Sequence, residues 1–242
     1  MRLYRLVGLG ALLWGQVGRP WQIGFQIGPN IPAYRTTQHV DKAVTLPGFT
    51  AGLVLRFPLA GPFYFQSGLY FNRRRSAYLL TESTPEDTVI GRLREEYIVH
   101  TTNDGQLTLA HLELPCLLEW NFLTAAHGRS YFLSGFHLGY LLYSRNVGTT
   151  RVALEGLDFL PLFGFPPQTR LIVAEGPVDN TRLRFRQPDL GVWMGGGSAH
   201  KMGPGQMTFE LRFFTALINI LQRPLNQRFY NGSLMLLMGY IF

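Results

Sequence analysis

The chain has 242 residues, of which 15% are charged and 14% aromatic, and its formal net charge is +7. Charged residues are scarcer than the roughly 25% of an ordinary soluble domain. No basic stripe is interleaved with stacking aromatic residues, so the sequence does not favour a nucleic-acid-binding protein. The single cysteine, Cys116, excludes an intramolecular disulfide and a cysteine-based zinc cluster.

The first residues have the order of a secretory signal peptide. Arg2 and Arg5 precede an apolar stretch from Leu6 to Trp14, and the small residue Gly15 follows. This stretch is too short to span a bilayer as a helix, and no run of about 18 apolar residues occurs elsewhere. The sequence therefore predicts an exported protein, with a signal peptide at residues 1–18 and a single domain at residues 19–242.

Eight segments show the period of two that is typical of β-strands with one apolar face. In the first of them, Trp21, Ile23, Phe25 and Ile27 alternate with glutamine and glycine. Each segment is close to the ~9–11 residues that a tilted membrane strand needs. The eight segments are residues 21–28, 49–57, 63–72, 111–122, 131–142, 189–197, 207–214 and 234–242.

Long and short connections alternate between these segments. Long polar or charged stretches at residues 29–47, 73–105 and 144–186 are separated by short links such as PLAGP and TAAHGR. Successive connections of an up-and-down barrel lie at opposite ends, so this pattern indicates one elaborated end and one trimmed end. Outer-membrane barrels have this asymmetry, with short periplasmic turns and long outer loops.

The direction of the apolar face separates a membrane barrel from a soluble lipocalin-like barrel, which packs its apolar residues inside. The polar face of the segments holds glycine, glutamine, tyrosine and asparagine with few charges, too few for a solvated exterior. We therefore expect an all-β, closed antiparallel up-and-down transmembrane β-barrel of about eight strands in the outer membrane. Phe25, Leu53, Leu118 and Phe209 should then face lipid.

Strand parity directs eight ionisable side chains into the lumen of this barrel. The interior of a small barrel is filled with side chains, so opposite charges are expected to pair there, and a catalytic or binding cluster is the alternative. In the pairing interpretation two arginines neutralise three glutamates. The eight lumen residues are Arg56, His111, Glu113, Glu119, His137, Asp189, Glu210 and Arg212.

A lipid-modifying enzyme would need a Ser–His pair, for which the candidates are Ser134, His137, Ser198 and His200. Ser134 and His137 have opposite parity on one strand, and the other two residues fall in a predicted periplasmic turn. No Gly-x-Ser-x-Gly or His-Glu-x-x-His motif occurs. The sequence therefore predicts no catalytic site, no metal site and no cofactor.

Two outer segments are candidates for binding. Arg73, Arg74 and Arg75 lie where the third strand leaves the membrane, and guanidinium groups match the phosphates of lipopolysaccharide. The start of a solvated loop is the alternative interpretation. The apolar segment Leu154–Phe165 either caps the barrel mouth or contacts another envelope protein.

The chain ends on SLMLLMGYIF, in which Met238, Tyr240 and Phe242 alternate with other residues. This pattern resembles the C-terminal β-signal that the barrel-assembly machinery recognises. We therefore expect these three residues to act as an assembly signal.

The strand pattern as a whole resembles the PorT-like family of small outer-membrane β-barrel proteins. The likeness covers nearly the whole mature chain in strand order, although the apolar segment Leu154–Phe165 is not part of it. The motifs that carry it are IGFQIGPN, GFTAGLVLRF, FYFQSGLYFNRRRS, HLELPCLLEWNF, YFLSGFHLGYLL, DLGVWMGGG and LMLLMGYIF.

This resemblance implies a structural or binding protein that acts through its extracellular loops in assembling a secretion or cell-surface complex. The expected partners are outer-membrane lipid and lipopolysaccharide, the barrel-assembly machinery and another envelope protein, without nucleic acid. A membrane-embedded lipid-A or phospholipid hydrolase is the second hypothesis, and a soluble lipocalin-like carrier is the third.

Overall fold

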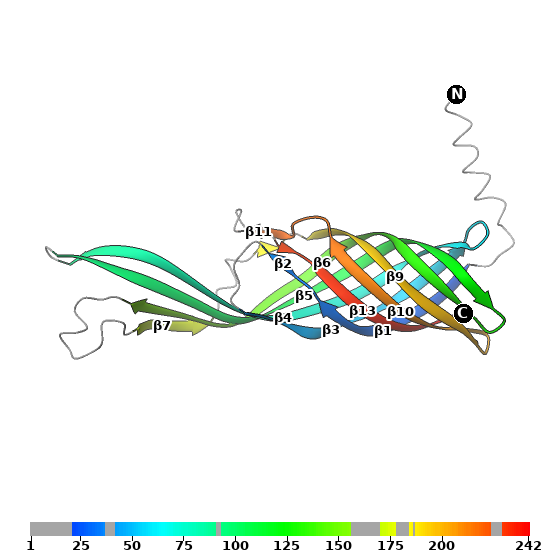
Figure 1. The fold of residues 1–242 in the computed structure, drawn as a ribbon, viewed down its shortest axis with the longest axis horizontal. Coiled ribbons are helices and arrows are strands. Elements are labelled where there is room, and N and C mark those ends of the chain that lie inside the picture. The colour runs from blue at the N-terminus through cyan, green and yellow to red at the C-terminus, as the bar shows by residue number, and fades with distance from the viewer. Residues whose placement is uncertain are drawn as a thin grey trace, which may run out of the picture.

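Eight long antiparallel strands form the body of the protein in the computed structural model (Figure 1). The structure describes residues 21–36, 42–90, 93–155, 170–177, 184–185, 187–223 and 229–242, so the predicted signal peptide lies outside the described residues. No helix long and apolar enough to cross a membrane occurs in these ranges. The eight strands are β1 (Gln22–Pro32), β3 (Lys42–Pro58), β4 (Phe63–Ile90), β5 (Leu93–Ala125), β6 (Gly128–Glu155), β9 (Pro188–Met202), β10 (Gly205–Ala216) and β13 (Gly232–Ile241).

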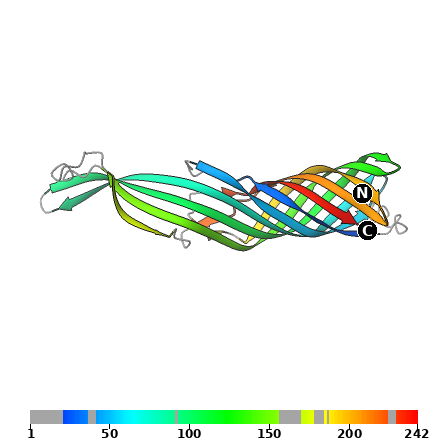
Figure 2. The ribbon, with the colours of Figure 1, turned by 90° about the horizontal axis from the view of Figure 1, so that it is seen from below.

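The eight strands close into a ring. Each strand pairs with the next long strand along the chain, and the last one, β13, pairs with the first, β1. The strands cross obliquely around the barrel wall (Figures 1 and 2). Closure leaves no free sheet edge within the barrel, which is what hydrocarbon demands of backbone N–H and C=O groups. The predicted closed antiparallel barrel is therefore confirmed.

The connections at one end of the barrel are short. Residues 59–62, 126–127 and 203–204 link three pairs of neighbouring strands. Gly61 and Gly203 have φ values of 60° and 61°, a left-handed conformation that glycine adopts without a steric penalty. In an outer-membrane barrel this trimmed end faces the periplasm. The first strand, β1, begins at this end, and the last strand, β13, finishes there.

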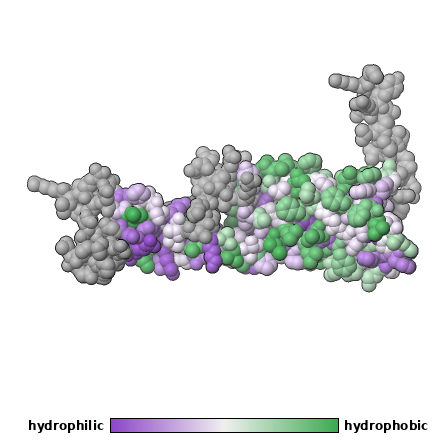
Figure 3. All heavy atoms as spheres, in the orientation of Figure 1, coloured by the Kyte–Doolittle hydropathy of each residue, from purple (hydrophilic) through white to green (hydrophobic). Residues whose placement is uncertain are grey.

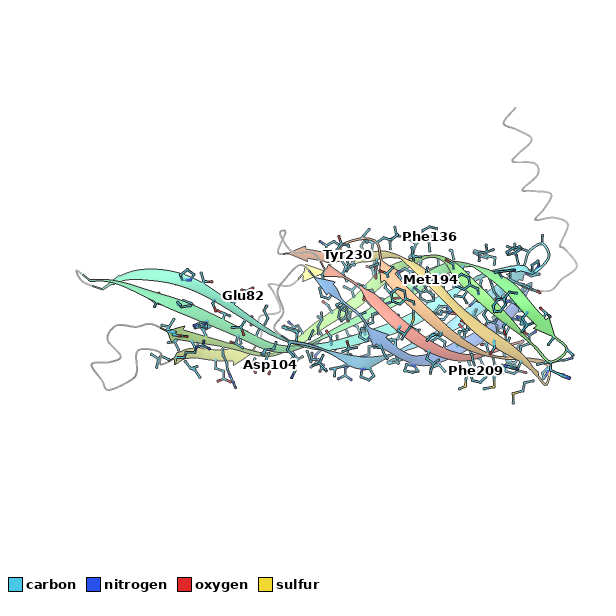
Figure 4. The ribbon with its side chains drawn as sticks, viewed as in Figure 1. Glu82, Asp104, Phe136, Met194, Phe209 and Tyr230 are labelled. Carbon is cyan, nitrogen blue, oxygen red and sulfur yellow. The ribbon has the colours of Figure 1, made fainter. Side chains whose placement is uncertain are left out.

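The apolar side chains of the barrel point outward. Phe25, Leu53, Leu118 and Phe209 are 49%, 57%, 50% and 43% exposed, as the membrane interpretation requires. Hydrophobic residues cover the barrel wall in Figure 3, and Phe209 projects from that wall in Figure 4. The soluble lipocalin-like alternative needs these side chains inside, and the structure overturns it.

Beyond the barrel, β4, β5 and β6 continue outward as one long sheet (Figure 1). The strand β7 (Leu171–Pro177) pairs with the outer part of β6 and completes this four-stranded extension. We call this sheet, made of residues 76–90, 93–107, 146–155 and 171–177, the outer extension. Its surface is mostly hydrophilic where the barrel is hydrophobic (Figure 3).

The outer extension corrects the prediction of long loops. Segments 73–105 and 144–186 were expected to be irregular, but most of the first and part of the second are strand. The cross-strand pairing of β4 with β5 continues without a break from Arg73 to Ile90, and it overrides the weak alternation of these polar sequences. Beyond Glu155, the predicted apolar loop Leu154–Phe165 lies outside the described residues.

Four short strands form two further ribbons. β2 (Arg35–Thr36) pairs with β12 (Phe229–Tyr230), and β8 (Arg184–Phe185) pairs with β11 (Leu221–Arg223). All four belong to connections at the outer end of the barrel, on the side away from the short turns.

Candidate functional site: the polar lumen and its two mouths

The middle of the lumen holds a charge pair within a hydrogen-bonded network. The Nε of Arg212 donates to Glu210 at 2.6 Å, and both side chains are buried. Tyr131 and Gln26 donate to the other carboxylate oxygen of Glu210, at 2.6 and 2.8 Å. Gln26 in turn accepts from Arg212 and from Tyr70. These contacts join β1, β4, β6 and β10 across the barrel.

The periplasmic part of the lumen has a second pair. Arg56 donates to both oxygens of Glu119, at 2.8 and 2.5 Å, and to the Oε1 of Gln22 at 2.8 Å. Its guanidinium also lies 3.5 Å from the ring centre of Tyr64. Arg129 approaches the same carboxylate, with its Nε 3.7 Å from Glu119. Two guanidinium groups therefore share one carboxylate at this level.

The outer part of the lumen has a third pair, which brings in a residue that the lumen prediction omitted. Arg74 donates to Glu113 at 2.5 Å and lies 3.3 Å from the Nδ1 of His111. The Nε2 of His111 is 4.0 Å from Asp189, which accepts a hydrogen bond from Asn231 at 3.2 Å. Arg74, and neither Arg56 nor Arg212, is thus the partner of Glu113.

All eight residues expected in the lumen are buried there, each 2% exposed or less. His137 stacks on Phe214 with ring centres 4.3 Å apart, and neither of its ring nitrogens has a hydrogen-bond partner. Among the described residues, no group of three or more His, Cys, Asp or Glu side chains is arranged to hold a metal ion. The lumen is thus a packed, ion-paired interior.

The buried position of Arg74 contradicts the prediction that Arg73, Arg74 and Arg75 form one lipopolysaccharide-binding cluster. Three consecutive strand residues cannot share a face, since side chains alternate across a strand. Arg74 is completely buried in the lumen, and Arg73 and Arg75 lie on the opposite face of β4. The cross-strand register aligns Arg75 with Thr108 and then with Arg145, so Arg145 shares the outward face at this level.

The outer mouth of the lumen is closed by apolar side chains. Leu107, Leu109, Leu141 and Ile220 form a buried cluster. The ring of Tyr34 packs against this cluster, and burial raises the pKa of the Tyr34 phenol above its usual range. In the part of the chain that the structure describes, this cluster separates the polar lumen from the outer extension.

A row of polar side chains crosses the outer extension. Ser83 Oγ is 2.8 Å from Nδ1 of His100, whose Nε2 is 2.8 Å from Glu155. Arg170, just before β7, donates to the same carboxylate at 2.6 Å, and this hydrogen bond lowers the pKa of Glu155. The row resembles a Ser–His–acid arrangement, but its strands are paired on both sides of His100. Sheet pairing uses the backbone N–H groups that could otherwise form an oxyanion hole.

The four Ser–His candidates for a lipid-modifying site do not come together in one pair. His137 points into the lumen, whereas Ser134 lies on the other face of β6. Ser198 and His200 were predicted to lie in a periplasmic turn, but both belong to strand β9. His200 is exposed.

The C-terminal alternating residues lie on the seam that closes the ring. Met238 and Tyr240 are opposite Ile27 and Phe25 of β1, and Met238 is 47% exposed on the outer face. The hydroxyl of Tyr240 donates to the carbonyl oxygen of Met202 at 2.7 Å. Phe242, which is 62% exposed, contacts the ring of Tyr240 with centres 4.9 Å apart.

Three solved structures are similar to this chain at low sequence identity. Ail of Yersinia pestis, solved in complex with the heparin analogue sucrose octasulfate, is 12% identical, with a TM-score of 0.39 over 93% of this chain and 100% of that one. OprG of Pseudomonas aeruginosa is 13% identical, with a TM-score of 0.42 over 91% and 95%. Neisserial surface protein A is 8% identical, with a TM-score of 0.40 over 90% and 95%.

Comparison with curated proteins gives no match. The profile of the family described as "Outer membrane protein beta-barrel domain" matches residues 14–222, which is most of the chain. The match agrees with the closed ring of eight strands and with the outward apolar face described above. The chain therefore belongs to the outer membrane protein beta-barrel domain family, and its location is the outer membrane.

Proposed function

We propose that this protein is a non-channel barrel whose outer extension binds another protein of the cell envelope. The filled lumen supports the first half of the proposal, because three ion pairs and an apolar cluster occupy the path that a solute would take. The outer extension supports the second half, since a hydrophilic sheet that projects from the barrel is accessible to partners. The observation that carries the proposal is the outer edge of this sheet at β7, which has no pairing partner among the described residues.

The free edge of β7 has the chemistry of a strand-addition site. Within the described residues β7 pairs only with β6, on one side. Leu171, Ile172 and Val173 are apolar side chains that are 42%, 60% and 50% exposed, and isoleucine and valine favour strands. Such an edge offers backbone hydrogen bonds and apolar contacts to an extended segment of a partner. A bulge at Val173 limits the length of added strand.

The opposite edge of the outer extension is protected. Beyond Leu79, β4 has no described partner except β5, and this edge carries Glu82, Pro85 and Glu86. Proline and charged side chains are the usual means by which proteins prevent edge pairing. The contrast between the two edges of one sheet supports β7 as the binding edge. The resemblance to the PorT-like family supports a secretion or cell-surface complex as the setting.

Photo-crosslinking in cells tests this function. A photoreactive residue at Ile172 should give one discrete protein adduct, and the same residue at Glu86 should not. A second site for the photoreactive residue is Val173. There, Ile172→Lys should reduce the adduct at least about tenfold, because a charge on an exposed edge opposes strand pairing. Normal barrel levels, checked by heat-modifiable gel mobility, are the control. Equal adducts at positions 172 and 86, or a steady, large conductance of the pure protein, would contradict the proposal.

The outward arginines at the outer rim are proposed to bind lipopolysaccharide phosphates. Removing Arg73 and Arg75 together, as Arg73→Ala/Arg75→Ala, should lower the lipopolysaccharide that co-purifies with the barrel at least about fivefold, since each guanidinium supplies charge-assisted hydrogen bonds. The matched control is Arg151→Ala, because Arg151 is 60% exposed on the outer extension, beyond the barrel. Unchanged lipopolysaccharide in the double variant would reject this site.

A further inference from the structure

The periplasmic mouth of the lumen is open, unlike the outer mouth. A cavity of about 330 Å³ lies where the β5–β6 turn and the β9–β10 turn meet the start of β1. The polar side chains that line it are Gln22, Thr124, His127, Arg129, Lys201 and Gln206. We call this cavity the periplasmic vestibule. Neither the proposed binding edge nor the ion pairs of the lumen account for it.

The periplasmic vestibule has an excess of positive charge. Arg129 and Lys201 line it, and no aspartate or glutamate does among its described lining residues. Arg129 lies 3.7 Å from Glu119, but Arg56 already binds this carboxylate through two hydrogen bonds, and Phe242, the last residue, also lines the cavity. Arg129 is only 12% exposed, and its Nε has no hydrogen-bond partner. A mostly buried guanidinium without a carboxylate of its own is costly unless an anion reaches it.

The neutral side chains of the vestibule also present donors. The Oε1 of Gln22 accepts from Arg56, and the Oε1 of Gln206 accepts from Arg129. An arginine can only donate, so it fixes which end of each amide is the oxygen. The two NH₂ groups are therefore left as donors, together with the ammonium of Lys201. The side chains of Gln22, Arg129, Lys201 and Gln206 therefore present donors to the vestibule, and these donors are complementary to a ligand with several acceptor oxygens.

We propose that the periplasmic vestibule binds a phosphate group presented from the periplasmic side. A phosphate offers several acceptor oxygens and a charge that Arg129 and Lys201 together can neutralise. The group can belong to a soluble phosphate compound or to the head group of a phospholipid in the inner leaflet. Both sources share the same chemistry, and accessibility of Lys201 distinguishes them.

The chain offers an internal control for this experiment because it contains only two lysines, Lys42 and Lys201. Lys42 is exposed at the start of β3, at the outer end of the barrel. The full chain in maltoside micelles is treated with pyridoxal phosphate and a reducing agent that traps the imine, and peptides are quantified by mass spectrometry. Pyridoxal, which lacks the phosphate, is the matched reagent.

The ratio of Lys201 to Lys42 labelling should be at least about fivefold higher with pyridoxal phosphate than with pyridoxal, because the phosphate is held beside Arg129. Inorganic phosphate should abolish this preference. Arg129→Gln and Gln206→Glu should each remove it, the second by placing a carboxylate in the vestibule. Arg151→Gln, on the outer extension, should leave it unchanged. Equal ratios for the two reagents in the folded wild-type barrel would overturn the proposal.

Amine acetylation of Lys201 then identifies the source of the phosphate. Protection by inorganic phosphate in maltoside micelles indicates a soluble ligand. Protection in phosphatidylglycerol vesicles without added phosphate indicates a lipid head group. The reference is acetylation in maltoside micelles without phosphate. If Lys201 is acetylated at the same rate relative to Lys42 in these micelles, in micelles with phosphate and in the vesicles, phosphate binding from either source is refuted.

Discussion

Arg212→Met is expected to lower the free energy of unfolding of the barrel by about 3–5 kcal/mol, the range for removing one partner of a buried ion pair. Glu210 is 2% exposed and would keep its hydrogen bonds from Tyr131 and Gln26 while losing its ion pair with Arg212. The measurement is urea unfolding in lipid vesicles, followed by the heat-modifiable mobility of the folded barrel.

A double variant separates charge from packing. Arg212→Met/Glu210→Gln removes both charges but keeps an acceptor for Tyr131, so most of the lost stability should return. Arg151→Met, in the exposed pair with Glu175, should leave stability nearly unchanged. If the single Arg212 variant loses less than about 1 kcal/mol, Glu210 is neutralised in another way, and the ion-pair account of the lumen fails.

Gly28→Ala is expected to prevent normal closure of the ring. A Cβ added at Gly28 would overlap the carbonyl oxygen of Leu236 on β13, the strand that closes the ring against β1. Backbone must then move on one side of the seam, which should destabilise the barrel by about 3 kcal/mol, the upper end for overpacking. The folded fraction after refolding into vesicles, read by gel mobility, measures the effect.

Gly176→Ala is the matched control, since nothing lies within 4 Å of a Cβ at Gly176 in β7. It should fold to the wild-type extent, because surface substitutions without a special contact change stability little. Equal folded fractions for the Gly28 and Gly176 variants would mean that β1 and β13 do not approach as closely as the structure has them.

The barrel could be predicted from the sequence because hydrocarbon imposes a rule on every strand. In each strand, apolar residues alternate with small or polar ones, and this alternation indicates both the strand and the face that points to lipid. Examples of the outward residues are Phe25, Leu53, Leu118 and Phe209. The same parity placed eight ionisable residues inside. It did not give their partners, since Gln26 meets Glu210 from 184 residues away, through a register that only the closed ring defines.

The errors have related causes. Arg74 was grouped with its neighbours because the third strand was taken to end at residue 72, although the alternation carried two residues further along β4 marks Arg74 as inward. The outer extension was missed because sequences such as TESTPEDT and HTTNDGQ lack an apolar face. In that region the ladder between β4 and β5 continues a pairing that begins in the membrane. Arg129 of the vestibule was also missed, because it lies before the segment 131–142 in which the alternation was recognised.

The unbroken passage of β4, β5 and β6 from the lipid into the outer extension has a mechanical consequence. A force applied by a bound partner along these strands loads many hydrogen bonds of the β4–β5 ladder together, in shear, between the point of pulling and the bilayer. Tension at the tip would therefore be transferred to the embedded wall before any single pair of strands separated.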